Sequence, residues 1–100
     1  MQHRGRGTLF FPDRREWGPV DYEIDEQPPT AMALGRIEGR LRPALGPPGP
    51  FPFWDFTEPP VTYGALRLAD ERWWLCVLQA DGRAVNRRGG IRRAGPQPEP

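Results

Sequence analysis

The alternation of apolar and polar residues along the chain predicts antiparallel strands. It is clearest at residues 20–25, where Val20, Tyr22 and Ile24 share one face and three acidic residues share the other. Residues 66–86 form three apolar-rich runs separated by two short turns, at 70–71 and at 81–82. The second turn is Asp-Gly, which readily adopts the positive φ angles of a tight hairpin. This stretch therefore predicts consecutive antiparallel hairpins.

Turn signals divide the chain into six expected strands, at residues 7–11, 17–25, 32–41, 61–68, 72–78 and 83–88, with Ile91 beyond the last one. The expected architecture is all-β: a small six-stranded antiparallel meander that forms a closed or partly open barrel. A two-sheet sandwich is the alternative. The core is expected to contain one of Trp73 and Trp74, together with Trp17, Tyr22, Ile24, Ile37, Leu41, Leu66, Leu68, Leu75 and Val77.

Two local features qualify this scheme. Gly35 and Gly39 share the inward face of the third expected strand, which indicates a bend or a close backbone neighbour. The opposite face carries Arg36 and Arg40, and antiparallel pairing would set them near the acids of the second strand. Residues 11–17 and 68–73 also resemble each other, since each has an apolar strand end, an acidic-basic turn and a Trp. Shared hairpin chemistry explains this likeness as well as duplication does.

Residues 43–60 are rich in proline, which excludes a helix and a central strand. The segment is too long for an ordinary connection and too apolar for a solvated linker. We expect an ordered flap that caps one mouth of the barrel. Its aromatic residues are candidate partner-binding residues, by themselves or through a polyproline-like segment; they are Phe51, Phe53, Trp54 and Phe56.

Length and composition predict one domain at residues 7–91, with flexible ends at 1–6 and 92–100. All 14 basic residues are Arg, and the chain has 14 Pro and 12 Gly, which is typical of a GC-rich bacterial genome. The net charge is +1, so no global field attracts nucleic acid or acidic membranes. No segment approaches the roughly 18 apolar residues of a membrane span, and no signal peptide is recognisable. A cytoplasmic location is the expectation.

The residues that usually carry catalysis are scarce, so we expect a non-enzyme without cofactor or metal. The chain has no Ser, its one His is His3 near the N-terminus, and its one Cys is Cys76 in an apolar run. One His and one Cys cannot supply a structural zinc site. No phosphate-binding or dinucleotide-binding motif occurs. Two carboxylates such as Asp21 and Asp25 are the remaining catalytic candidates, although their alternation with apolar residues is typical of a solvated strand face.

Two binding functions remain. The first is a non-catalytic module that engages another protein, or a second copy of itself, through the flap. The alternative is single-stranded nucleic-acid binding by a basic strip and an exposed Trp, as small β-barrels achieve by stacking and phosphate contacts. The residues of this alternative are Arg83, Arg87, Arg88, Arg92, Arg93 and Trp74. The same arginines also suit a solubilised edge strand.

Overall fold

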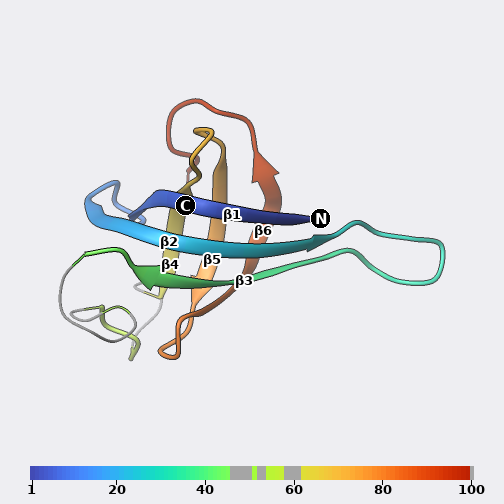
Figure 1. The fold of residues 1–100 in the computed structure, drawn as a ribbon, viewed down its shortest axis with the longest axis horizontal. Helices are drawn as coiled ribbons and strands as arrows, with labels where there is room; N and C mark the ends of the chain where they lie inside the picture. Colours follow the sequence, from blue (N-terminus) through green and yellow to red (C-terminus); the bar gives the residue numbers. More distant parts are fainter. Residues whose placement is uncertain (46–50, 52–53, 58–61, 100) are drawn as a thin grey trace.

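Six antiparallel strands close into a barrel in the computed structural model, which describes residues 1–45, 51, 54–57 and 62–99 (Figure 1). The strands are β1 (Gln2–Phe10), β2 (Glu16–Gln27), β3 (Arg36–Pro43), β4 (Tyr63–Arg67), β5 (Trp73–Leu78) and β6 (Arg83–Arg92). The expected all-β, six-stranded antiparallel barrel is confirmed, and the barrel is closed. The described residues contain no helix, and hence none long and apolar enough to cross a membrane.

The strand order is β1-β2-β3-β6-β5-β4, so the barrel consists of two three-stranded meanders rather than one continuous meander. The first meander meets the second where β1 pairs with β4 and where β3 pairs with β6. Exchanging β1 with β4, β2 with β5 and β3 with β6 leaves this pairing scheme unchanged. The two halves are therefore topologically equivalent, and the similar segments 11–17 and 68–73 occupy equivalent turns.

One turn chemistry recurs in three hairpins, Phe11–Arg15, Leu68–Arg72 and Gln79–Arg83. In each, the fourth residue donates its N–H to the carbonyl oxygen of the first, over 2.9–3.0 Å, and has a positive φ. The third residue is Asp, and it accepts bonds from the backbone N–H and the side-chain Nε of the Arg two residues later. The turns are thus three-residue loops with a single left-handed residue.

These hydrogen bonds affect the acidity of the turn carboxylates. The backbone N–H of Arg15 lowers the pKa of Asp13, and the guanidinium of Arg15 lowers it further. The backbone N–H of Arg83 likewise lowers the pKa of Asp81. The stabilising contribution of both carboxylates is present above their unfolded pKa and is lost as the pH falls through the folded value, because protonation removes the acceptor.

Several strand bounds differ from the sequence-based prediction. β1 begins at Gln2 instead of residue 7, because Arg4 and Arg6 form ion pairs with Glu23 and Asp21 on β2. Because these contacts join charged side chains, the alternation of apolar residues does not reveal them. β3 begins at Arg36 instead of residue 32, and β6 extends to Arg92. The flexibility predicted for residues 1–6 and 92–100 remains a prediction.

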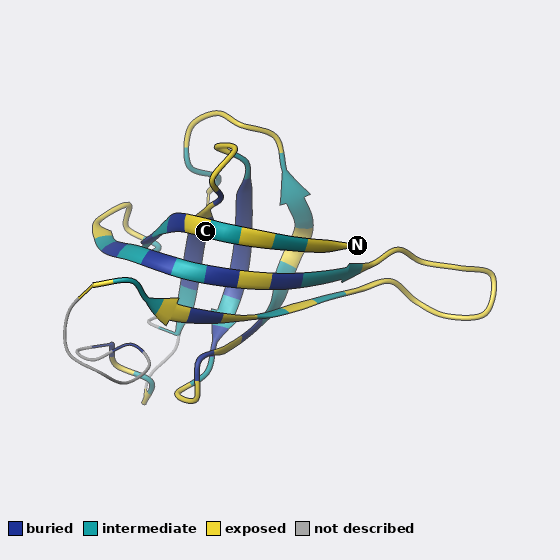
Figure 2. Cartoon of the chain, in the orientation of Figure 1, coloured by how far each residue is buried: buried dark blue, intermediate teal, exposed yellow. Residues whose placement is uncertain are grey.

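Large side chains fill the barrel interior. Figure 2 shows the buried residues alternating with less buried ones along the strands, most clearly along β2. The largest fully buried side chains are those of Trp74, Phe51, Leu9, Ile24, Leu41, Leu66, Val20 and Cys76. Most of the predicted core residues are buried, but Trp17, Ile37 and Val77 are only partly buried. A Cβ at Gly39 would lie 2.6 Å from the carbonyl oxygen of Glu23, so glycine permits the close approach of β3 to β2.

Both faces of β5 are buried. Trp74 points into the barrel, whereas Trp73 packs with Ala65, Leu75 and Phe10 in a second cluster on the outside. The C-terminal segment crosses this cluster: Trp73 Nε1 donates to the carbonyl oxygen of Gly95 over 2.8 Å. A second bond ties Gln97 Nε2 to the carbonyl oxygen of Phe11. The prediction that one of the two adjacent Trp side chains is exposed is therefore wrong.

Replacing Glu71 by Gly is expected to stabilise the protein by about 0.5–1 kcal/mol. Glu71 is exposed and has a φ of 70°, which costs a non-glycine residue about 1–2 kcal/mol, partly offset by the larger unfolded-state entropy of Gly. Urea unfolding measures the change. Gly82→Ala, at a φ of 91° in the equivalent position, is the matched control and should destabilise. Equal effects of the two substitutions would contradict this account of the turns.

Candidate functional site

The described aromatic side chains of the flap belong to the core. Phe51 and Trp54 are 2% and 6% exposed, and Phe56 is partly buried against the same cluster. Trp54 stacks on Phe11 with ring centroids 4.4 Å apart, and Trp17 lies edge-on to Phe51 at 5.6 Å. Phe53, the fourth candidate, lies outside the described residues. Phe51 and Trp54 therefore offer almost no surface to a partner.

The basic strip of the nucleic-acid hypothesis lacks its aromatic platform. Trp74 is fully buried, and its Nε1 donates to Asn86 Oδ1 over 3.1 Å inside the barrel. Trp73 is 3% exposed, and Trp54 is also buried. A base that stacks on an indole needs an open ring face. The stacking role predicted for Trp74 is therefore incompatible with its position.

The five arginines of the strip have different surroundings. Arg83 pairs with Asp81 and bonds Gln79, Arg87 lies 3.8 Å above the Tyr63 ring, and Arg88 donates to the carbonyl oxygen of Glu99. The Nε of Arg92 is buried without a hydrogen-bond partner in the described part of the chain, while Arg93 is exposed. The register of β5 and β6 shifts between the pairs Trp74–Ile91 and Cys76–Asn86, so Arg87 and Arg88 lie in a bulge between Arg83 and Arg92. The structure does not gather the five into one basic groove.

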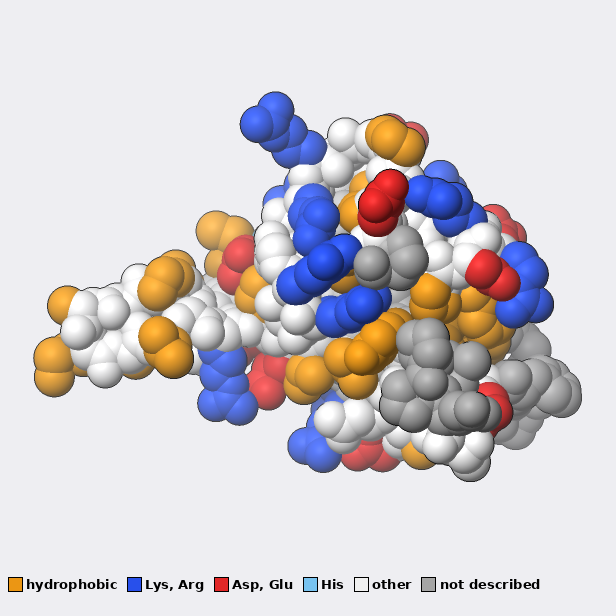
Figure 3. Space-filling model, turned by 180° about the vertical axis from the view of Figure 1, so that it is seen from behind, with side chains coloured by type: hydrophobic (Ala, Val, Ile, Leu, Met, Phe, Trp, Pro, Cys, Tyr) orange, Lys and Arg blue, Asp and Glu red, His pale blue; other side chains and the backbone are white. Residues whose placement is uncertain are grey.

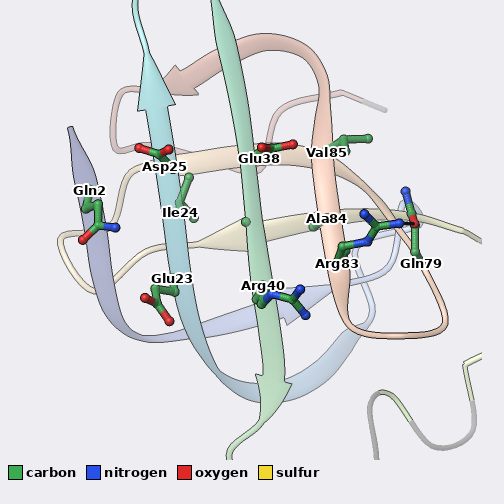
Figure 4. A pocket seen from close by; sticks show the side chains of 11 residues that line it. Gln2, Glu23, Ile24, Asp25, Glu38, Arg40, Gln79, Arg83, Ala84 and Val85 are labelled. Carbon is green, nitrogen blue, oxygen red and sulfur yellow. Dashed lines mark hydrogen bonds between the residues drawn. The ribbon is translucent and has the colours of Figure 1, made fainter.

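A groove of about 470 Å³ lies on the outer side of β2, β3 and β6 (Figure 4). Its side chains carry both signs of charge: the strand register sets Asp25 opposite Glu38, and Arg40 opposite Arg83. Like charges directly opposite each other are unfavourable. Asp81 pairs with Arg83, and the charge of Arg40 also lowers the pKa of Asp81. The groove is therefore a mixed-charge surface without a single electrostatic preference.

The candidate catalytic groups are occupied by structural contacts. Asp21 pairs with Arg6, and Asp25 accepts a bond from Gln27. Burial raises the pKa of the Cys76 thiol to about 12, which leaves it protonated and unreactive at neutral pH.

The His3 side chain is held by several contacts, although it lies near the N-terminus. It lies in β1 with its side chain 10% exposed, Nε2 is 3.1 Å from Glu26 Oε1, and Nδ1 is 3.4 Å from an Arg72 nitrogen. The ring therefore links β1, the end of β2 and the β4–β5 turn. No sequence pattern pointed to this contact, because it joins residues 69 positions apart.

The connection between β2 and β3 projects far from the barrel (Figure 1). We call residues 28–35 the arm and residues 31–34 its tip. The principal extents of the molecule are 43, 27 and 24 Å, and the arm lies along the longest (Figure 1). Met32 is 94% exposed and Leu34 is 93% exposed, the highest values among the described large apolar residues. Figure 3 shows hydrophobic side chains along the projection and at its end, without any charged side chain there.

The arm is ordered by local hydrogen bonds. Thr30 Oγ1 accepts bonds from the N–H groups of Met32 and Ala33, and the N–H of Thr30 donates to the carbonyl oxygen of Ala33. Pro28 and Pro29 have no N–H, which discourages pairing of this edge with another strand. The tip therefore presents apolar side chains rather than a sheet edge.

The arm differs from the structure predicted from the sequence. Met32 and Leu34 are spaced two residues apart, as on a strand face, and so they were assigned to the third strand. The signal that could have revealed the arm is the absence of charge from residue 28 to residue 35, between the acidic end of β2 and Arg36. Comparison with protein-family models, with curated proteins and with solved structures finds no match to this chain.

Replacing Trp54 by Ala is expected to destabilise the protein by about 3–5 kcal/mol, because it removes a buried indole from the end of the barrel. Trp54→Phe should cost much less, since it keeps a ring against Phe11 and removes a buried Nε1 that has no hydrogen-bond partner in the described residues. Leu45→Ala, at an exposed position, is the control. Chemical denaturation measures all three. A loss below about 1 kcal/mol for Trp54→Ala would show that the flap is not part of the core.

Titration with single-stranded DNA at low salt is expected to leave the tryptophan fluorescence unchanged, because Trp54, Trp73 and Trp74 have no open ring face and Trp17 packs against the core. A quench that weakens steeply with salt would contradict this, since it would show phosphate contacts together with base stacking. Arg87→Ala with Arg88→Ala would then test whether the strip is responsible.

Proposed function

We propose that this protein is a non-catalytic binding module that engages another protein molecule through the tip of its β2–β3 arm. The observation that carries the proposal is the near-complete exposure of Met32 and Leu34 at the end of an ordered projection. Single exposed apolar residues are common on protein surfaces. Here two of them stand together on a segment without charge, held away from the rest of the molecule.

The barrel has no structural need of the arm. In the topologically equivalent hairpin, β5 and β6 are joined by the short turn Gln79–Arg83. The same turn chemistry would join β2 to β3 with four residues between the strands, whereas the arm has eight. The added length also carries a cost, because ordering each backbone residue loses about 1–2 kcal/mol of conformational entropy. An ordered extension that exposes its largest apolar side chains almost completely is typical of an interaction surface.

The proposal retains the function class that the sequence indicated and moves the contact surface from the flap to the arm. The flap aromatics Phe51 and Trp54 stabilise the barrel, whereas Met32 and Leu34 stabilise nothing in the isolated chain. The tip has no positively charged side chain, so it offers no contact to the phosphates of a nucleic acid.

Photo-crosslinking from the tip tests the proposal. A benzophenone amino acid placed at position 32 in the producing cells should yield covalent adducts with protein. The same group at Leu45, which is 72% exposed outside the arm, is the matched control and should not. Absence of a position-specific protein adduct at 32 would contradict the proposal.

The double variant Met32→Ser with Leu34→Ser should then weaken binding of the identified partner roughly a hundredfold, because two aliphatic side chains no longer leave water on binding. Its melting temperature should stay that of the natural chain, since both positions are exposed. Leu45→Ser controls for the loss of an exposed apolar residue. An unchanged affinity of the double variant would show that the tip is not the contact surface.

A further inference from the structure

A small hollow lies at the root of the arm. It has a volume of about 250 Å³, and its lining combines apolar groups with a polar rim. Pro28, Pro29, Ile37 and the glycines Gly35 and Gly90 supply the apolar part, while the rim consists of Glu26, Gln27, Arg36 and Asn86. Small-molecule pockets usually enclose about 300–1,000 Å³. This hollow is below that range and suits an aliphatic side chain better than a metabolite.

We infer that the tip binds a second copy of this chain, so that two arms cross side by side in opposite directions and each tip occupies the hollow at the other arm's root. This inference rests on the proposed function and names its partner. The apolar tip and the hollow lie at opposite ends of the same arm, so one two-fold axis through the middle of the crossed arms brings both contacts together. Such a self-complementary arrangement is what a two-fold dimer interface requires.

The dimensions of the arm agree with this arrangement. Met32 lies four positions after Pro28, a reach of at most about 13 Å in extended backbone. Two arms that overlap over this length place each tip at the other root while the barrels stay at opposite ends. Because both tips are used reciprocally, the assembly closes at two copies and leaves no tip free to extend into a fibre.

Charge favours a second copy over an anionic membrane. The arm itself is uncharged, so crossing two arms brings no like charges together. Its root carries Glu26, with Asp25 beside it and the Arg36–Glu38 pair across the hairpin. A loop that inserts into anionic lipid is expected to be flanked by an excess of basic residues, and this root has none.

The interface is small, so the dimer is expected to be weak. Two crossed arms bury far less than the roughly 1,200–2,000 Å² of a stable complex. We expect a dissociation constant of roughly 0.1–1 mM, as for weak transient contacts.

Sedimentation equilibrium of the purified chain tests the inference. Between about 20 μM and 1 mM the average mass should rise from 11.4 kDa toward twice that value. Met32→Ser with Leu34→Ser should remain monomeric, and Leu45→Ser should dimerise like the natural chain. A constant mass of 11.4 kDa for the natural chain, or equal dimerisation of the tip variant, would overturn the inference.

Disulfide trapping tests the direction of the arms. Cys76 is buried, so an introduced cysteine is the accessible thiol. A mixture of Met32→Cys and Gln27→Cys proteins under oxidised glutathione should form mixed dimers, because tip meets root. Met32→Cys alone should crosslink at least tenfold more slowly, since the two tips lie at opposite ends. Faster crosslinking of Met32→Cys with itself would overturn the antiparallel arrangement.

The two proposals fail in distinguishable ways. If position 32 crosslinks to a different protein in cells while the purified chain stays monomeric, the second-copy inference is wrong and the proposed function stands. If the chain is monomeric and position 32 captures no protein, both are wrong.

Discussion

The filling of the barrel interior is the constraint on which the rest of the structure depends. Six strands enclose a space that Trp74 occupies together with aliphatic side chains from both meanders. Trp74 Nε1 bonds Asn86 Oδ1, so the interior tolerates the indole without an unpaired donor. Phe51 and Trp54 complete this core from the flap. Among the described residues the barrel interior is therefore occupied by side chains rather than by an open cavity.

The outside of the barrel is also largely committed to stability. Ion pairs cover β1 and β2, the C-terminal segment covers Trp73, and Asp-Arg turns close three hairpins. Against this background the arm differs from every other described connection, since it is long, uncharged and apolar at its end. The equivalence of the two meanders makes the difference clear, because the matching β5–β6 connection is a tight turn. The barrel fold therefore does not require the arm, whereas a role in binding another molecule would account for it.

Local patterns made much of the fold predictable. The alternation at residues 20–25 identified β2, and the acidic turn residues identified the hairpins, because these signals act between near neighbours. Long-range contacts were not predictable. The burial of Trp73 depends on the C-terminal segment, that of Trp74 depends on closure of the barrel, and the order of the strands depends on pairing between β3 and β6. The exposed tip of the arm was the hardest feature to predict. Met32 and Leu34 have a strand-like spacing, and only the strand pairing of the closed barrel shows that they lie outside β3.

Methyl NMR of the natural chain gives the most direct test of the account. The chain has two methionines, Met1 and Met32, so methyl-labelled methionine yields two signals. Both side chains are exposed, at 78% and 94%. Met1 bonds the backbone of Glu26 at the root of the arm, so the two methyl groups report on the two ends of the proposed contact. If the tip binds a second copy, the Met32 signal should shift and broaden as the protein concentration rises toward about 1 mM, in step with the average mass of the protein in solution. A Met32 signal that remains unchanged over this range would contradict the arm as the site of self-association.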